Sequence, residues 1–197
     1  MARRDGGSSM GKLVITEFVS LDGVMQSPGG EKFKYEGWTF EFDRGEDGNQ
    51  FKLDEIMSAD AHLLGRVTYE SFAGAWPTRE GPFAERLNQD PKYVVSTTLR
   101  DPEWTNVTVL DSGDAPAQVA KLKDEIDGTI LLAGSRRLAQ ELLDADLVDQ
   151  INLMVFPVIL GTGDRLFGEM NEKTTWKLVE SRQVGPDGVL VLSYQRS

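Results

Sequence analysis

Apolar positions along the chain follow two periods, and segments of the two kinds alternate. Short apolar runs typical of strands cover residues 12–19, 60–65, 92–99, 106–110 and 128–134. Helical spacing covers residues 49–59, 116–126 and 135–145, and a further helix start follows the second strand at residue 66. Strands that alternate with helices predict an α/β fold with a mostly parallel sheet covered on both faces.

The final third of the chain has no long helical pattern. Strand-like runs cover residues 148–159, 175–184 and 188–197, and the turn sequence "GPDG" joins the last two. The sequence therefore predicts an antiparallel C-terminal hairpin at the edge of the sheet.

Residues 23–48 interrupt the alternation of strands and helices. They combine Gly, Pro and acidic residues with five aromatic residues. A loop of this length is uncommon in a compact domain unless it has a functional role. We therefore expect this segment to be a lid over a binding site.

Composition limits the classes of function. The length of 197 residues predicts a single domain over residues 10–197, with residues 1–9 a disordered leader or a remnant of cloning. A net charge of −11 argues against partners such as nucleic acid or an anionic membrane. The chain has no cysteine and one histidine, so we expect no metal. We also expect a cytoplasmic protein.

Candidate chemistry gathers where three predicted strands end. In an open α/β sheet, ligands bind outside the carboxyl ends of the strands. Glycine lets an anion approach the backbone, and arginine binds phosphate oxygens through two N–H groups. The residues at these ends are Gly65, Arg66 and Thr68, then Ser96 and Thr97, and finally Gly134, Ser135 and Arg136.

Simpler explanations exist for the same residues. Each strand end taken singly fits an ordinary turn with a capping hydroxyl. The cationic residues Arg136 and Arg137 begin a helix, which is the unfavourable end for positive charge. Besides a bound anion, neighbouring acids are possible partners for them, namely Asp144, Asp146 and Asp149.

Other motifs are poor matches to known sites. The stretch 161–166, "GTGDRL", lacks the third glycine of a dinucleotide fingerprint, and 43–54 resembles a calcium loop without its third-position ligand. We interpret His62 as a core residue. The helical stripe of Phe51, Ile56 and Met57 is also predicted to be core.

Five motifs, taken in order, resemble the dihydrofolate reductase-like superfamily. They are "FVSLDG", "LLGRVTYE", "VVSTTL", "LLAGSRRLAQELL" and "LVDQINLMVFPVILGTGDRLF". More narrowly, they are similar to the branch that contains the C-terminal reductase domain of bifunctional riboflavin-biosynthesis proteins. The resemblance covers residues 10–194 and implies a three-layer α/β/α sandwich, NADPH as cofactor and a homodimer.

The resemblance also implies roles for individual residues. Gly65, Arg66 and Thr68 match a segment that holds cofactor phosphates, and Ser96 and Thr97 match the strand end beside the adenosine 2′-phosphate. Gly134, Ser135 and Arg136 match the turn under the pyrophosphate. Phe18 and Val19 would flank the nicotinamide. Asp22 begins the covering loop and is the candidate proton donor, with water or a plain turn-forming role as the alternatives.

These expectations define the predicted function. The main hypothesis is an NADPH-dependent reductase acting on a small-molecule substrate, a heterocycle or aminopyrimidine, as a 5-amino-6-(5-phosphoribosylamino)uracil reductase does. The alternatives are a non-catalytic nucleotide-binding or ligand-binding homodimer and a pterin or dihydrofolate reductase. The folate enzymes carry an acid near the position of Asn49, which disfavours the last alternative.

Overall fold

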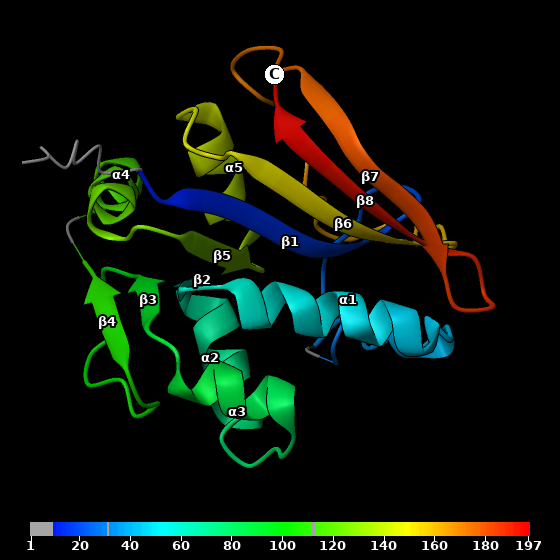
Figure 1. Cartoon of the computed structure of the whole chain (residues 1–197), viewed down its shortest axis with the longest axis horizontal. Helices are drawn as coiled ribbons and strands as arrows, with labels where there is room; N and C mark the ends of the chain where they lie inside the picture. Colours follow the sequence, from blue (N-terminus) through cyan, green and yellow to red (C-terminus); the bar gives the residue numbers. More distant parts are fainter. Residues whose placement is uncertain (1–9, 31, 112) are drawn as a thin grey trace, which may run out of the picture.

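The sheet of the protein contains eight strands in the order β4-β3-β2-β5-β1-β6-β8-β7 (Figure 1). The computed structural model describes residues 10–30, 32–111 and 113–197, so the predicted leader of residues 1–9 lies outside the described residues. The elements are β1 (Lys12–Ser20), the 3-10 helix η1 (Trp38–Glu41), α1 (Gly45–Ser58), β2 (Ala61–Gly65), α2 (Arg66–Ala75), α3 (Pro82–Gln89), β3 (Lys92–Val95), β4 (Val107–Leu110), α4 (Ala115–Glu125), β5 (Thr129–Ala133), α5 (Arg136–Asp144), β6 (Gln150–Phe156), β7 (Trp176–Val184) and β8 (Val189–Arg196).

The direction of the strands confirms the predicted sheet. β1 pairs in parallel with β5 and β6, and β2 pairs in parallel with β3 and β5. β8 is antiparallel to both β6 and β7, and it alone among the described strands runs against the others. The two last strands therefore form the antiparallel hairpin, with β7 as the edge strand.

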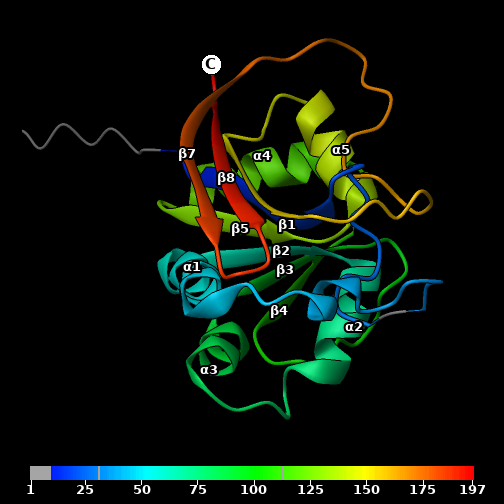
Figure 2. The ribbon, with the colours of Figure 1, turned by 90° about the vertical axis from the view of Figure 1, so that its right-hand side faces the viewer.

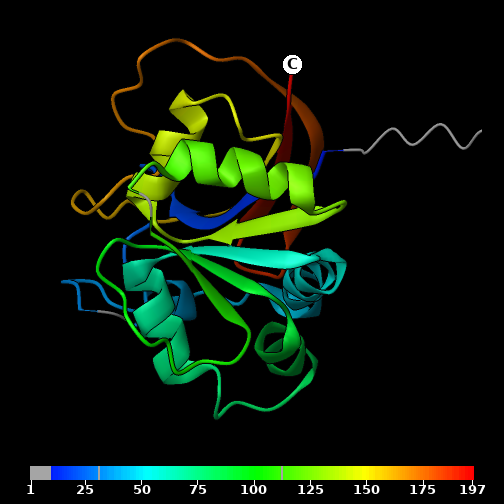
Figure 3. The same ribbon diagram turned by 90° about the vertical axis from the view of Figure 1, so that its left-hand side faces the viewer.

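Helices cover both faces of the sheet, as the alternating pattern predicts. α4 and α5 lie on one face, and α1, α2 and α3 lie on the other (Figures 2 and 3). Leu13 and Ile15 of β1 pack with Leu142 of α5, whereas Leu64 of β2 packs with Leu87 of α3. All five side chains are buried, and each contributes about 1.5–3 kcal/mol through removal from water. The three layers of an α/β/α sandwich result.

The third strand is shorter than predicted. β3 ends at Val95 and not at residue 99. The Ser96 hydroxyl accepts hydrogen bonds from the backbone N–H groups of Thr98 at 3.2 Å and Leu99 at 2.9 Å. These bonds turn the chain away from the sheet, because a serine side chain competes with the strand ladder for backbone donors.

Two helical segments also differ from the prediction. α1 begins at Gly45, four residues early, and its predicted core stripe is wrong at Met57, which is 51% exposed, although Phe51 and Ile56 are buried. α3 was not predicted, because only two of its eight residues are buried. Its last carbonyls bind the ammonium group of Lys92, a cation at the helix end where the dipole favours one.

The predicted lid is partly a core element. Within residues 23–48, Trp38 of η1 is buried, and its ring packs edge-on against Phe156 at 5.4 Å between centroids. The indole N–H donates to the carbonyl of Gln26 at 2.9 Å. Phe40, by contrast, is 76% exposed. The aromatic residues of this segment therefore divide between the core and the surface.

The single histidine is a core residue, as predicted. His62 is buried, and its Nε2 lies 2.9 Å from Oδ2 of Asp90. In the described part of the chain, no three His, Asp or Glu side chains gather as metal ligands would, and residues 45–54 of the stretch that resembles a calcium loop are helical, as part of α1. None of the described helices is long and apolar enough to span a bilayer.

Candidate cofactor and active site

The carboxyl ends of β2 and β5 meet at Ser135. These strands are neighbours in the sheet, so the turns that follow them lie side by side. The backbone N–H of Gly65 donates a hydrogen bond to the Ser135 hydroxyl at 2.7 Å, and the Thr68 hydroxyl lies 2.9 Å from the same oxygen. The structure therefore joins the first turn of α2 to the start of α5, as the grouping of strand ends predicts.

Glycine is required at this junction. Gly134 has a φ of +67°, and a β-carbon there would lie 2.6 Å from Oγ1 of Thr68. A β-carbon on Gly65 would collide with the hydroxyl of Ser135. At both positions the space that a β-carbon would take is filled by the side chain of the other turn, so glycine is what lets the two turns pack together.

Both helices at the junction begin without a side-chain cap. Gly65 precedes α2 and Ser135 precedes α5, and neither first turn contains an acidic residue. The contrast is α4, where the Asp114 carboxylate accepts a hydrogen bond from the N–H of Ala117. A helix N-terminus carries about half a positive charge, so the two uncapped ends create a region that favours a negative ligand.

The arginines at the two helix starts have different partners. Arg66 forms an ion pair with Glu70 at 2.7 Å on the surface of α2. Arg136 lies 3.5 Å from Asp164, which belongs to the loop between β6 and β7, and Arg137 is exposed. The three acids that the sequence offered as partners for these arginines bind other groups. Asp144 accepts a hydrogen bond from the N–H of Asn171. Asp146 pairs with Arg196, and Asp149 pairs with Lys123.

The end of β3 lies next to this junction. Gly65 is in register with Val95, so Ser96 and Thr97 follow at the neighbouring position of the same sheet edge. The hydroxyl of Ser96 is buried and bound within its own turn. Thr97 is exposed, so it is the residue of this pair that can reach a ligand.

The end of β1 is occupied by core side chains. Val19 is buried on the face covered by α4 and α5. Phe18 points to the opposite face, where its ring packs edge-on against Phe156 at 5.6 Å. The ammonium group of Lys52 and the guanidinium of Arg44 lie 5.0 and 5.3 Å from the Phe18 ring centroid. The two residues predicted to flank a nicotinamide thus lie on opposite sides of the sheet.

Asp22 connects two loops. Its carboxylate accepts hydrogen bonds from the Ser20 hydroxyl at 2.7 Å and the N–H groups of Leu160 and Gly161 at 3.1 and 3.0 Å, and it pairs with Arg165 at 3.2 Å. These bonds, first of all the one from Ser20, lower the pKa of Asp22 to about 2. A carboxyl with this pKa is ionised at neutral pH and has no proton to give.

Glu17 is a candidate site residue that the sequence analysis missed. It is 5% exposed, and its Oε1 has no hydrogen-bond partner in the part of the chain that the structure describes. Burial raises the pKa of Glu17 to about 8, although Lys52 and the backbone of Gly134 act in the opposite direction. The signal was an acid inside a mainly apolar strand, "KLVITEFV", most of whose residues are buried.

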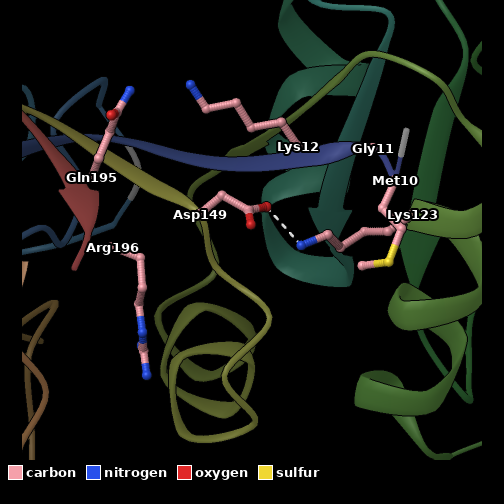
Figure 4. Close-up of a pocket in the computed structure, with 7 residues that line it drawn as sticks. All are labelled: Met10, Gly11, Lys12, Lys123, Asp149, Gln195 and Arg196. Carbon is pink, nitrogen blue, oxygen red and sulfur yellow. Dashed lines mark hydrogen bonds and ion pairs between the residues drawn. The ribbon is translucent and has the colours of Figure 1, made fainter. Parts of the chain in front are cut away.

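A hollow of about 370 Å³ lies at the other end of the strands, where β1 begins and β8 ends (Figure 4). Lys123 faces Asp149 there at 2.6 Å, while Lys12 and Arg196 extend away from each other (Figure 4). Because the cations do not converge, this hollow does not have the geometry of a phosphate site.

These features define a dihydrofolate reductase-like fold in which two glycine turns and two uncapped helix starts meet at the carboxyl ends of the strands. The model of the RibD C-terminal domain matches residues 11–190, and the chain belongs to this family. It is 31% identical over 174 residues to the uncharacterized protein YwjB of Bacillus subtilis, covering 88% of this chain and 92% of that protein.

Solved structures share the fold. A putative riboflavin biosynthesis protein from Shewanella sp. PV-4 superposes with a TM-score of 0.75 at 21% identity, over 94% of this chain and 99% of that one. Dihydrofolate reductase from Enterococcus faecalis, complexed with NADP(H), superposes with a TM-score of 0.61 at 18% identity, over 95% and 97% of the two chains.

Proposed function

We propose that the protein is an NADPH-dependent reductase that transfers hydride to a small heterocycle or aminopyrimidine, as a 5-amino-6-(5-phosphoribosylamino)uracil reductase does. The observation that carries the proposal is the contact between Gly65 and Ser135, which brings together two uncapped helix starts, each with an arginine in its first turn. Membership in the RibD C-terminal domain family supports the same reaction class.

The residues present fit a pyridine nucleotide. Gly134, Ser135 and Arg136 would hold the diphosphate, because the start of α5 has no capping side chain and no acid in its first turn, and its helix dipole favours an anion. Arg66 and Thr97, exposed at neighbouring strand ends, would bind the 2′-phosphate. The bound cofactor would supply the hydride, and the protein would supply orientation and electrostatics.

Glu17 replaces Asp22 as our candidate for the group that holds a proton. The raised pKa keeps the Glu17 carboxyl protonated at neutral pH, and the residue lies beside the backbone of Gly134. A buried carboxyl whose oxygen has no partner among the described residues destabilises the fold, and such costs are concentrated at functional sites. Asp22 has the opposite properties and a structural role in joining two loops.

A non-catalytic nucleotide-binding protein is the second candidate. The observation that favours it is the filled end of β1, where Phe18 and Val19 are packed into the two cores. A pterin or dihydrofolate reductase has less support, because the position near which the folate enzymes carry an acid is Asn49, an exposed amide on α1.

The test compares two glycine variants. In Gly65→Ala the new β-carbon collides with the Ser135 hydroxyl, whereas Gly74→Ala in α2 meets no atom within 4 Å. Thermal stabilisation by NADPH and by NADH is measured first, and NADPH oxidation with a panel of aminopyrimidines and dihydrofolate second. We expect NADPH to stabilise the wild type and Gly74→Ala but not Gly65→Ala.

Each outcome decides between the candidates. Turnover with an aminopyrimidine supports the reductase. Stabilisation by NADPH without turnover on any substrate favours the non-catalytic binding protein. The absence of stabilisation by either nucleotide would rule out the cofactor site.

A further inference from the structure

Arg136 has an internal anion as its partner. Its Nη2 lies 3.5 Å from Oδ1 of Asp164, and the two side chains are 39% and 52% exposed. Arg136 is also the arginine that the proposed function assigns to the cofactor diphosphate. One guanidinium therefore has two candidate partners, and the carboxylate occupies it in the free protein.

The backbone of Asp164 is fixed rather than free to swing. The N–H of Met25 donates to the Asp164 carbonyl at 2.9 Å, and the N–H of Asp164 donates to Oε1 of Gln26 at 3.1 Å. The adjacent Arg165 binds both the carbonyl and the carboxylate of Asp22. The Asp164 carboxylate therefore stays near Arg136 whether or not the ion pair is intact.

Space for a ligand adjoins the pair. Arg136 and Asp164 both line a hollow of about 300 Å³ between α5 and the loop after β6. The other lining residues are Gln140, Gly163, Arg165, Phe167, Gly168 and Glu169. An anion can thus enter beside Arg136 without displacing a packed core side chain.

We propose that Asp164 determines cofactor affinity by competing with the diphosphate for Arg136. The inference rests on the proposed function. On binding, Arg136 exchanges the carboxylate for phosphate oxygens, and the negative charge of Asp164 is left close to the negative ligand. Both effects weaken binding, and both decrease at high salt because the groups are half exposed.

The test removes one charge at a time from the same hollow. Asp164→Asn keeps the size of the side chain and removes the competitor, so the Kd for NADPH should fall by about three- to tenfold at low salt. Glu169→Gln is the matched control, because Glu169 lines the same hollow but forms no ion pair with Arg136 among the described residues. We expect its Kd to stay close to that of the wild type. Binding is followed by nucleotide fluorescence without any substrate.

The same substitution made in a protein without Arg136 separates the exchange of partners at Arg136 from simple charge repulsion between Asp164 and the ligand. In Arg136→Gln, NADPH should bind more weakly, and adding Asp164→Asn should bring a smaller gain than in the wild type, because only the repulsion between the carboxylate and the ligand is then removed. An equal gain in both backgrounds would overturn the exchange, as would an unchanged or higher Kd in Asp164→Asn alone. If NADPH binds neither to the wild type nor to any variant, the proposed cofactor site itself fails, and this inference fails with it.

Discussion

The hydroxyl of Ser135 accepts the backbone N–H of Gly65 at 2.7 Å while Ser135 itself has a left-handed backbone with a φ of 64°. A non-glycine residue in this conformation costs about 1–2 kcal/mol. The side chain compensates for this cost, because its hydroxyl binds the neighbouring strand end. Serine at this position therefore combines a strained backbone with a link between β2 and α5.

The link predicts a difference between two variants. Ser135→Ala keeps the backbone strain and loses the hydrogen bond, so it should reduce the free energy of unfolding by about 1–2 kcal/mol. Ser135→Gly also loses the bond but relieves the strain, so its stability should stay within about 1 kcal/mol of the wild type. Urea unfolding measures both. Equal losses in the two variants would show that the backbone is not strained.

Glu17 should make stability depend on pH. Its pKa is raised from 4.5 to about 8, so the unfolded chain releases the proton first, and stability falls as pH rises from about 4.5 to 8. The fall is about 1.4 kcal/mol per pH unit between the two pKa values, so the whole loss is at most about 5 kcal/mol. Glu17→Gln should remove the dependence and be more stable than the wild type at pH 8.5. Parallel melting curves of both proteins at pH 5 and 8.5 test this, and a constant difference between them would contradict the raised pKa.

We expect Asp22 to hold two loops in place rather than to donate a proton. Asp22→Asn weakens the bonds to Leu160, Gly161 and Arg165, so hydrogen exchange should increase in residues 20–26 and 158–166 together. Its stabilising effect is lost only as pH falls from about 4 towards 2, because the pKa is lowered to about 2. Arg165→Gln should cause the same exchange pattern, and the double variant should add little. Faster exchange in only one of the two segments would contradict the joint role.

Arg66 tests the choice between the two nicotinamide cofactors. Arg66→Ala should raise the Kd for NADPH far more than that for NADH, because only NADPH carries the 2′-phosphate. Glu70→Gln removes the ion-pair partner of Arg66 and should shift the preference further towards NADPH. Titration of both nucleotides against the three proteins provides the measurement. Equal losses for NADPH and NADH in Arg66→Ala would place the 2′-phosphate elsewhere.

The homodimer stays a prediction, and the hairpin is our candidate for its interface. Leu178, Val179 and Leu190 of β7 and β8 are 40–47% exposed in a chain with a net charge of −11. β7 and β8 form the outer edge of the sheet, beyond β6 (Figure 1). Leu190→Glu should convert a dimer to monomers in light scattering, and Phe40→Glu, which changes a lone exposed ring, should not. A monomeric wild type would refute the dimer.

The sequence predicted the layers of the fold and the meeting of strand ends, because both follow from the order of strands and helices. It failed where side chains compete for backbone groups, as at Ser96, and where a short helix such as α3 buries few residues. Glu17 was missed because its environment depends on strands distant in the sequence. The partner of Arg136 could not be predicted either, since Asp164 comes from a loop whose path is fixed by Asp22.

The reversed direction of β8 has a practical consequence. Because β8 is antiparallel to β6, Gln195 ends up opposite Gln150 and close to the start of β1, where Met10 and Arg196 line the same hollow (Figure 4). Met10 and Arg196 therefore both lie at the end of the strands that is opposite to Gly65 and Ser135. A tag or surface tether attached after Ser197 therefore begins at the opposite end of the strands from Gly65 and Ser135, so an immobilised form of the protein keeps the proposed cofactor site open to solution.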